Sequence, residues 1–89
     1  MDRVARIRAA LTEAFAPRHL VIEDESHKHA GHAGAATGRG HFRVEIVSGA
    51  FAGLPPLARH RQVYAALGSL MDTDIHALSL QARAPEETA

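Results

Sequence analysis

Three histidines, His27, His29 and His32, lie within six consecutive positions of this 89-residue chain, with glycine and alanine around them. Imidazole is the commonest metal ligand in proteins, and its protonation ordinarily changes between about pH 5 and pH 8. The chain contains no cysteine, so the thiolates of a soft-metal or iron–sulfur site would have to come from another molecule. The pattern predicts a loop that takes part in metal binding.

The hydrophobic pattern on either side of this loop predicts two helices and three strands. Apolar residues recur at helical spacing near the N-terminus and again after Pro55 and Pro56, whereas strict alternation marks the strands. The expected elements are a helix over 2–16, a strand over 19–25, a loop over 26–41, a strand over 42–48, a helix over 57–71 and a strand over 75–83.

This order, α-β-β-α-β, predicts an α+β two-layer domain with both helices on one face of a three-stranded mixed sheet. The first two strands should form an antiparallel hairpin. The strand-helix-strand unit that follows should place the third strand parallel to the second, with a right-handed crossover. The length of the chain predicts a single domain over 1–85, followed by a frayed tail over 86–89.

The spacing also predicts which residues of the last helix and strand are buried. From Leu57 on, the apolar stripe of the helix is expected to include His60, Val63 or Tyr64, Leu67, and Leu70 or Met71, with Arg59 and Arg61 beside it. Alternation along the last strand places one set of residues on a shared face. That set is His76, Leu78, Leu80 and Ala82.

Parallel strands begin at the same edge of a sheet, and this predicts where the histidines meet. The strand over 42–48 begins where the histidine loop ends, and the strand over 75–83 begins at Ile75 and His76. If these strands are neighbours, connectivity alone brings five histidines to one edge. They are His27, His29, His32, His41 and His76.

Each of these histidines also has a structural interpretation. His76 could be a strand-end residue whose ring is satisfied by a backbone group, and His60 falls on the apolar stripe of a helix. His19 has the position of an ordinary surface residue. The loop itself could be a flexible polar spacer that binds metal only adventitiously, although a solvated spacer has no need of three imidazoles.

Two to four histidines without acids or cysteines could bind Zn, Cu or Ni, which would make the protein a metal buffer that works alone. The same nitrogens could instead bind one iron of a [2Fe–2S] cluster, because iron accepts two histidines in place of two cysteines in Rieske centres. Ligation requires neutral imidazoles, so either site should weaken at acidic pH.

The sequence contains no catalytic constellation, and we expect a protein that is not an enzyme. Asp24, Ser26 and His27 are the residue types of a hydrolase triad, but near neighbours in a chain rarely reach triad geometry, and no nucleophile elbow is present. Gly38 and Gly40 lack the spacing and the following helix of a phosphate-binding loop.

The charge balance argues against strong nucleic-acid binding. Ten basic and ten acidic residues cancel, and the isoelectric point is about 7.1. A modest basic patch from Arg43, Arg59 and Arg61 would still allow weak DNA binding, with a solvated helix face as the alternative. No apolar run is long enough to span a bilayer, and the N-terminus lacks the pattern of a signal peptide, so we expect a cytoplasmic protein without membrane association.

Four linked segments of the chain resemble the BolA family. They are Asp24-Glu25-Ser26 with the histidine loop, the run His41-Phe42-Arg43-Val44 that leads to Phe51-Ala52-Gly53, the run from Arg59 to Leu67, and Ile75-His76-Ala77-Leu78-Ser79-Leu80. Any one of these segments is a weak signal, but the four in this order and at these spacings make a specific match over nearly the whole chain.

The resemblance implies a fold similar to the class II KH domain and a heterodimer with a monothiol glutaredoxin. In the heterodimer that the resemblance implies, a [2Fe–2S] cluster bridges the two proteins. The glutaredoxin supplies two of its ligands, the active-site cysteine and the thiol of a bound glutathione. The resemblance assigns the other ligands to His76 and to a loop histidine, best matched by His29, with His27 and His32 as alternatives. It also implies a role in iron–sulfur trafficking and iron homeostasis.

Without its partner, the protein is expected to be a monomer or a weak homodimer. The BolA family also includes members described as transcriptional regulators, which keeps a DNA-binding regulator as the alternative function. The Gly-x-x-Gly clamp of KH domains is missing, because Gly53-Leu54-Pro55-Pro56 supplies one glycine and two prolines without backbone donors.

Overall fold

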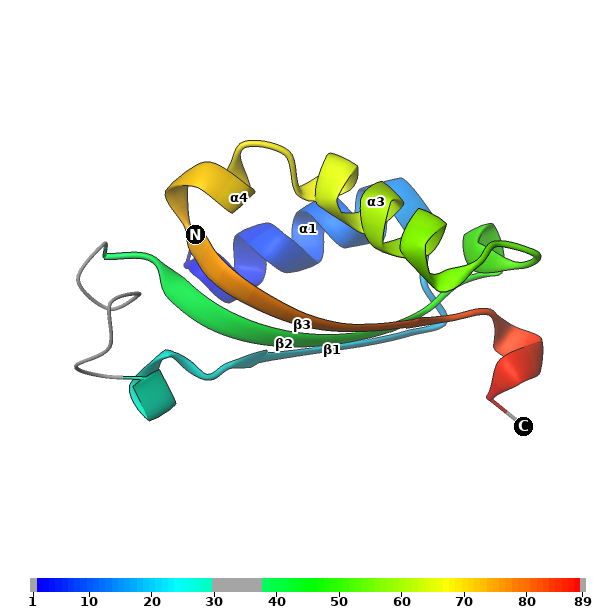
Figure 1. Ribbon diagram of the computed structural model, residues 1–89, viewed down its shortest axis with the longest axis horizontal. Helices are drawn as coiled ribbons and strands as arrows, with labels where there is room; N and C mark the ends of the chain where they lie inside the picture. Colours follow the sequence, from blue (N-terminus) through cyan, green and yellow to red (C-terminus); the bar gives the residue numbers. More distant parts are fainter. Residues whose placement is uncertain (1, 30–37, 89) are drawn as a thin grey trace.

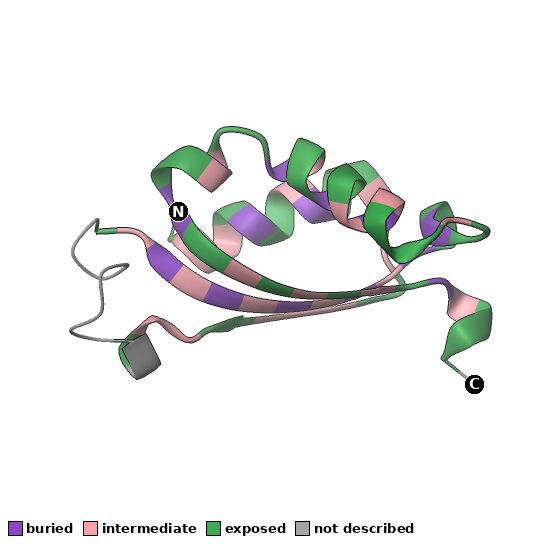
Figure 2. Cartoon of the chain, viewed as in Figure 1, coloured by how far each residue is buried: buried purple, intermediate pink, exposed green. Residues whose placement is uncertain are grey.

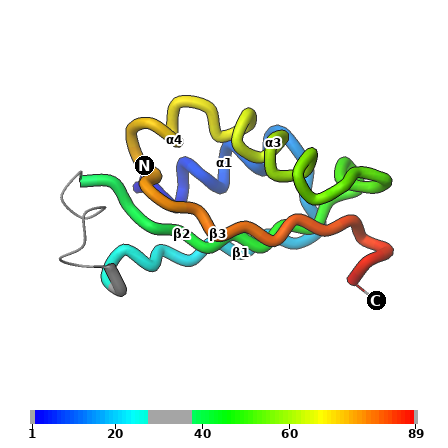
Figure 3. Tube along the Cα trace, viewed as in Figure 1, coloured from blue at the N-terminus to red at the C-terminus, as the bar shows by residue number. Residues whose placement is uncertain are grey.

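The computed structural model describes residues 2–29 and 38–88 (Figures 1 and 3). Its helices and strands follow the predicted order, with short helical turns added between them. In chain order they are α1 (Arg3–Phe15), β1 (His19–Asp24), η1 (Ser26–His29), β2 (Gly40–Val47), η2 (Gly49–Phe51), α3 (Pro56–Leu67), α4 (Leu70–Thr73), β3 (Ile75–Arg83) and η3 (Pro85–Glu87).

The three strands form one sheet in the order β1-β2-β3. β1 pairs antiparallel with β2, and β2 pairs parallel with β3, as the strand-helix-strand connectivity predicts. Figure 1 shows α1 and α3 on the same side of the sheet, and none of the α-helices in the described residues covers the opposite face. The predicted α+β two-layer fold with a mixed sheet is therefore confirmed.

The core lies between the helices and the sheet, and β2 contributes one complete face to it. Every second residue of β2 is buried and the residues between are half-buried, which is the alternation that the sequence predicts (Figure 2). The apolar residues that form the buried cluster come from α1, β2, η2, α3 and β3, and Leu20 and Ile22 of β1 are partly buried against them. The members of the buried cluster are Ile7, Leu11, Phe42, Val44, Ile46, Phe51, Val63, Leu67 and Ile75.

Two features of α3 differ from the sequence-based expectation. The helix ends at Leu67 rather than continuing to 71, because Gly68 adopts a positive φ of 55° and its amide caps the carbonyl of Tyr64. The predicted stripe is also only partly right: Val63 and Leu67 are buried as expected, but Leu57 is 61% exposed and Tyr64 41% exposed, whereas Arg59 is 8% exposed. The buried face of α3 is therefore Arg59, Val63 and Leu67.

Arg59 can occupy this buried face because each of its three side-chain nitrogens finds an acceptor. Its Nε donates to the carbonyl of Leu54 at 2.8 Å, and its Nη1 donates to the carbonyl of Ala82 at 3.0 Å. The two terminal nitrogens, Nη1 and Nη2, also donate to the carboxylate of Glu87, at 2.6 and 2.7 Å. This bidentate ion pair ties α3 to η3, so the segment expected to fray at 86–89 is held against the domain as far as Glu87.

The Arg59–Glu87 pair should make stability depend on pH in the acidic range. Chiefly through the hydrogen bonds from Arg59, and then through the bond from the Ala84 amide, the pKa of Glu87 falls from 4.5 to about 2. A carboxylate with a lowered pKa stabilises the fold above its ordinary pKa and loses that contribution as the pH falls through the folded value. Between pH 4.5 and 2, the free energy of unfolding should therefore fall more steeply in the wild type than in Glu87→Gln.

Urea denaturation at several pH values measures this slope. Glu86→Gln is the matched control, because Glu86 is an exposed neighbour in the same η3 turn. Equal slopes in the wild type and Glu87→Gln would contradict the prediction.

Candidate metal centre

The candidate site lies where β2 and β3 begin, and its geometry depends on an irregularity in their pairing. Gly40 pairs with Ile75 and His41 pairs with Ala77, which leaves His76 as an extra residue in β3. Such a bulge re-aims a side chain that strict alternation would direct elsewhere. Ile75 is fully buried, whereas His76 is exposed. The expectation that His76 shares a face with Leu78, and Ile75 the opposite face, is therefore wrong at the start of β3, where Ile75 lies in the core.

The bulge brings His76 next to His41, the second residue of β2. The centroids of the two imidazole rings lie 5.3 Å apart, with 45° between the ring planes. The sequence places His41 at this edge but does not include it among the candidate ligands. The signal that could have identified it is the parallel pairing, since residues that begin adjacent parallel strands must lie side by side.

Asp74 anchors the start of β3 from the side of α1. Its carboxylate lies 2.8 Å from Nη1 of Arg6 and 3.6 Å from Nε of Arg3, and its backbone carbonyl accepts from the amide of Gly40 at 2.9 Å. The hydroxyl of Thr73, followed by Arg6, holds the pKa of Asp74 below its ordinary value despite burial. The residue two positions before His76 is thus fixed by contacts to both α1 and β2.

The end of β1 holds His41 from the other side. The amide of Glu25 donates to the carbonyl of His41 at 2.8 Å, and the amide of His41 donates to the Ser26 hydroxyl at 3.1 Å. Ser26 is in turn held by Asp24, whose carboxylate accepts from the Ser26 amide at 2.9 Å. The hydrogen bond from the Ser26 side chain is also the main cause that lowers the pKa of Asp24.

Glycine is the residue type that fits at position 40, where η1 approaches β2. A Cβ at this position would lie 2.6 Å from Oγ of Ser26 and 2.8 Å from Cε2 of Phe42. Phe42 is 2% exposed and belongs to the packed core, so a displacement of its ring would disturb that packing. The close approach of η1 to β2 therefore depends on this glycine.

Of the predicted ligands, the structure places His76 beside His41 and places His27 on the surface of η1, which adjoins β2. His29 is the last residue of η1, and His32 lies outside the described residues. Among the described residues, no group of three or more His, Asp or Glu side chains could hold a metal ion. The described part of the edge thus supplies a pair of imidazoles.

The other histidines lie elsewhere in the fold. His60 packs edge-on against Tyr64 on α3, with 6.5 Å between the ring centroids. His19 begins β1, at the end of the sheet where β2 and β3 finish. Neither residue belongs to the histidine edge, which agrees with the structural interpretations given above.

The three arginines considered for nucleic-acid contact do not form a patch. Arg59 is buried in its bonds to η3, as described above. Arg43 pairs with Glu23 and, at 3.3 Å, with Glu45 on the open face of the sheet, and the hydrogen bond to Glu23 is the main cause that raises its pKa. Arg61 is exposed on α3. Two of the three cations are thus already engaged by carboxylates.

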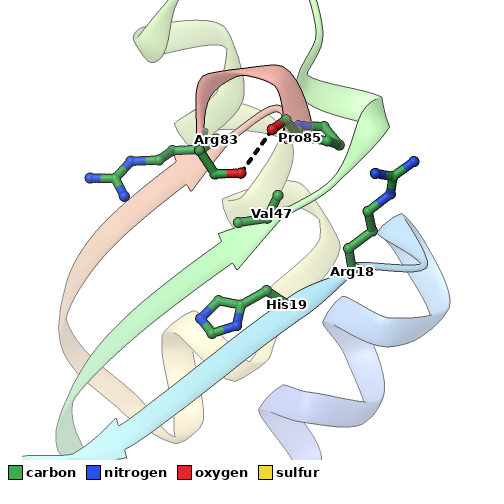
Figure 4. Close-up of a pocket in the computed structure, with 6 residues that line it drawn as sticks. Arg18, His19, Val47, Arg83 and Pro85 are labelled. Atoms are coloured by element: carbon green, nitrogen blue, oxygen red, sulfur yellow. Dashed lines mark hydrogen bonds between the residues drawn. The ribbon is translucent and has the colours of Figure 1, made fainter.

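Hollows occur at both ends of the sheet. One of about 270 Å³ adjoins the histidine edge, lined by Glu25, His41, Phe42, Ala77, Leu78 and Ser79. A larger one, about 380 Å³, lies at the opposite end beside Arg18, His19, Val47 and Arg83. Figure 4 shows the guanidinium groups of Arg18 and Arg83 pointing in different directions. The two arginines of the larger hollow therefore do not converge on a shared ligand position, and the smaller hollow belongs to the candidate site.

Within the described residues, no helix is both long enough and apolar enough to cross a lipid bilayer.

Comparisons with known proteins connect this architecture to a family. The family model described as BolA-like protein matches residues 11–87. Human BolA-like protein 1 is 47% identical over 83 residues, which cover 93% of this chain and 58% of the relative. The chain therefore spans a little over half the length of that relative.

Solved structures show the same fold over the whole domain. BolA1 from Arabidopsis thaliana superposes with a TM-score of 0.86 at 42% identity, covering all of this chain and 98% of that one. The BolA domain of SufE1 from Arabidopsis thaliana gives a TM-score of 0.85 at 38% identity, with 98% and 96% covered. The resemblance seen in the sequence is thereby confirmed, and the chain belongs to the BolA-like protein family.

Proposed function

We propose that this protein is a non-catalytic adaptor for iron–sulfur trafficking in the cytoplasm. In this proposal it binds a monothiol glutaredoxin and supplies histidine nitrogens to a [2Fe–2S] cluster that the two proteins share. The observation that supports it most directly is the exposed His76 ring, which a strand bulge places beside His41 at the edge where the histidine loop returns.

The donor chemistry of this edge fits one side of such a cluster. His76 and a loop histidine, His29 in the first instance and His27 or His32 otherwise, would hold one iron through nitrogen. The chain has no cysteine, so the thiolates at the other iron would come from the glutaredoxin and its glutathione. When bound, the cluster supplies a one-electron centre or a transferable cofactor, and this chain contributes nitrogen ligands and a rigid strand edge.

The position of the edge also suits a shared site. His76 and His27 are both exposed, and the adjoining hollow of about 270 Å³ leaves room for groups from a second protein. The occurrence of a BolA domain within a protein named SufE1 supports a domain that works together with other proteins. A role in iron homeostasis would follow if the amount of loaded heterodimer tracks the iron supply.

Co-expression with a monothiol glutaredoxin tests the proposal. The purified complex should contain both proteins in equal amounts and should show visible absorption and circular dichroism distinct from those of the glutaredoxin expressed alone. Separate elution of the two proteins, or a spectrum identical to that of the glutaredoxin alone, would reject the proposed function.

A further inference from the structure

Arg39 makes three contacts that join the end of the histidine loop to the start of β3. Its Nη1 donates to the backbone carbonyls of Met71 and Asp72, each at 3.2 Å. Its Nη2 lies 3.4 Å from Nδ1 of His76. One guanidinium therefore contacts both the turn that precedes β3 and the ring of the principal candidate ligand.

The chemistry of the guanidinium determines which proton the His76 ring carries. A guanidinium remains charged at all relevant pH values and has only donors, so a hydrogen bond to it requires an acceptor. Nδ1 of His76 must then present its lone pair to Arg39. In the neutral ring, the proton must consequently lie on Nε2.

We propose that Arg39 is a positioning residue that holds His76 in the Nε2–H form in the free protein and competes with a metal for the same ring. This inference rests on the proposed function only in taking His76 as a ligand. Arg39 must leave Nδ1 before His76 binds iron or any other metal.

For a neutral imidazole ligand, the competition holds whichever nitrogen binds the metal. A metal on Nδ1 needs the lone pair that faces Arg39. A metal on Nε2 needs the proton to move to Nδ1, where it would point at a cation that has no acceptor. Ligating histidines normally donate their second N–H to a carboxylate, a carbonyl or water, and Arg39 offers the opposite polarity.

The release of Arg39 has a structural consequence at the loop. The segment at 38–40 is held by Arg39 through the carbonyls of Met71 and Asp72, and by Arg3, which donates to the carbonyl of Gly38. When Arg39 leaves the ring, its hold on the turn before β3 can also loosen. Occupation of His76 is thus coupled to the end of the loop that carries the other candidate ligands.

Long-range proton–nitrogen NMR on the ¹⁵N-labelled free protein tests the first step, at a pH where the rings are neutral. In the wild type, His76 should be held in the Nε2–H form, whereas Arg39→Met should move it toward the tautomer ratio of the exposed His27. Arg61→Met, which removes an exposed arginine from α3, is the matched control and should leave His76 unchanged. Identical tautomer ratios for His76 in the wild type and Arg39→Met would overturn the inference.

A titration with Zn²⁺ as the probe, followed by isothermal titration calorimetry, tests the competition. Arg39→Met should bind about two- to tenfold more tightly than the wild type, which corresponds to the loss of one ordinary hydrogen bond. In a His76→Ala background the gain should fall below about twofold, because only the removal of a positive charge would remain. Equal affinities, including no binding by either protein, or a gain of about twofold or more without His76, would overturn it.

Both measurements use the free protein without glutaredoxin or cluster. Failure of the co-expression experiment therefore leaves the Arg39 result intact, and a tautomer that does not respond to Arg39 leaves the proposed adaptor function intact.

Discussion

The His76→Ala variant is expected to fold and to bind the glutaredoxin, but to lose the distinctive spectrum of the shared cluster. His76 is exposed at a bulge, so truncation removes an imidazole without opening a cavity in the core. Loss of groups that merely orient a metal ligand typically costs about 10–100-fold in affinity, and loss of a ligand should cost at least as much. The lifetime of the cluster should therefore fall roughly tenfold or more.

Visible circular dichroism of the co-expressed complex, followed over time in the presence of a chelator, measures this effect. His60→Ala is the matched control, because it removes a histidine that packs against Tyr64 on α3 rather than at the histidine edge. An unchanged spectrum and lifetime in His76→Ala would exclude His76 as a ligand.

The same assay tests which of the remaining histidines binds the cluster. Alanine at His29 should reproduce the loss seen for His76, whereas alanine at His27 or His32 should leave the spectrum unchanged if His29 is the second ligand. Alanine at His41, whose ring lies 5.3 Å from that of His76, distinguishes a ligand from a neighbour that only supports the ring. If no loop variant alters the spectrum, the cluster ligands from this protein must come from β2 and β3.

The Phe51→Ala variant is expected to lose much of the stability of the domain. Phe51 is fully buried in η2 and packs against Phe15, with 5.0 Å between the ring centroids. Truncation of a buried phenylalanine costs about 3–5 kcal/mol, because transfer energy is lost and a cavity remains. The free energy of unfolding of a typical domain is only about 5–15 kcal/mol. The Phe51→Ala variant should therefore be only marginally stable.

Thermal unfolding followed by far-ultraviolet circular dichroism provides the measurement. For a domain of this size the melting temperature should fall by at least about 12 °C. Leu57→Ala is the control, since Leu57 is large and apolar but 61% exposed, and its truncation should leave the melting temperature nearly unchanged. A fall in Phe51→Ala no larger than that in Leu57→Ala would contradict the assignment of η2 to the core.

The sequence predicts the main elements well because their signals are local. Alternation identifies β2 and its buried Phe42, Val44 and Ile46, and connectivity predicts that β3 runs parallel to β2. The meeting of His41 with His76 follows from that pairing. The family resemblance is a property of the sequence in the same sense, since it depends on residue types and their order.

Sequence patterns failed where a polar residue is buried by partners from distant segments. On α3, Leu57 and Tyr64 look like core residues and Arg59 looks like a surface cation, yet the structure reverses these roles. The reason is that burial of Arg59 depends on the carbonyls of Leu54 and Ala82 and on the carboxylate of Glu87. Periodicity within one helix contains no information about such acceptors.

By itself, the sequence determined the order of the elements, the polarity of the sheet and the meeting of His41 with His76 at one edge, because each follows from local periodicity and chain connectivity. Only the tertiary structure decided how those histidines are presented. The bulge that exposes His76 arises from the pairing of two strands, and the contact of Arg39 with its Nδ1 requires the turn before β3 to meet the end of the loop. Such contacts depend on the positions of segments far apart in the chain, which no spacing within a single segment encodes.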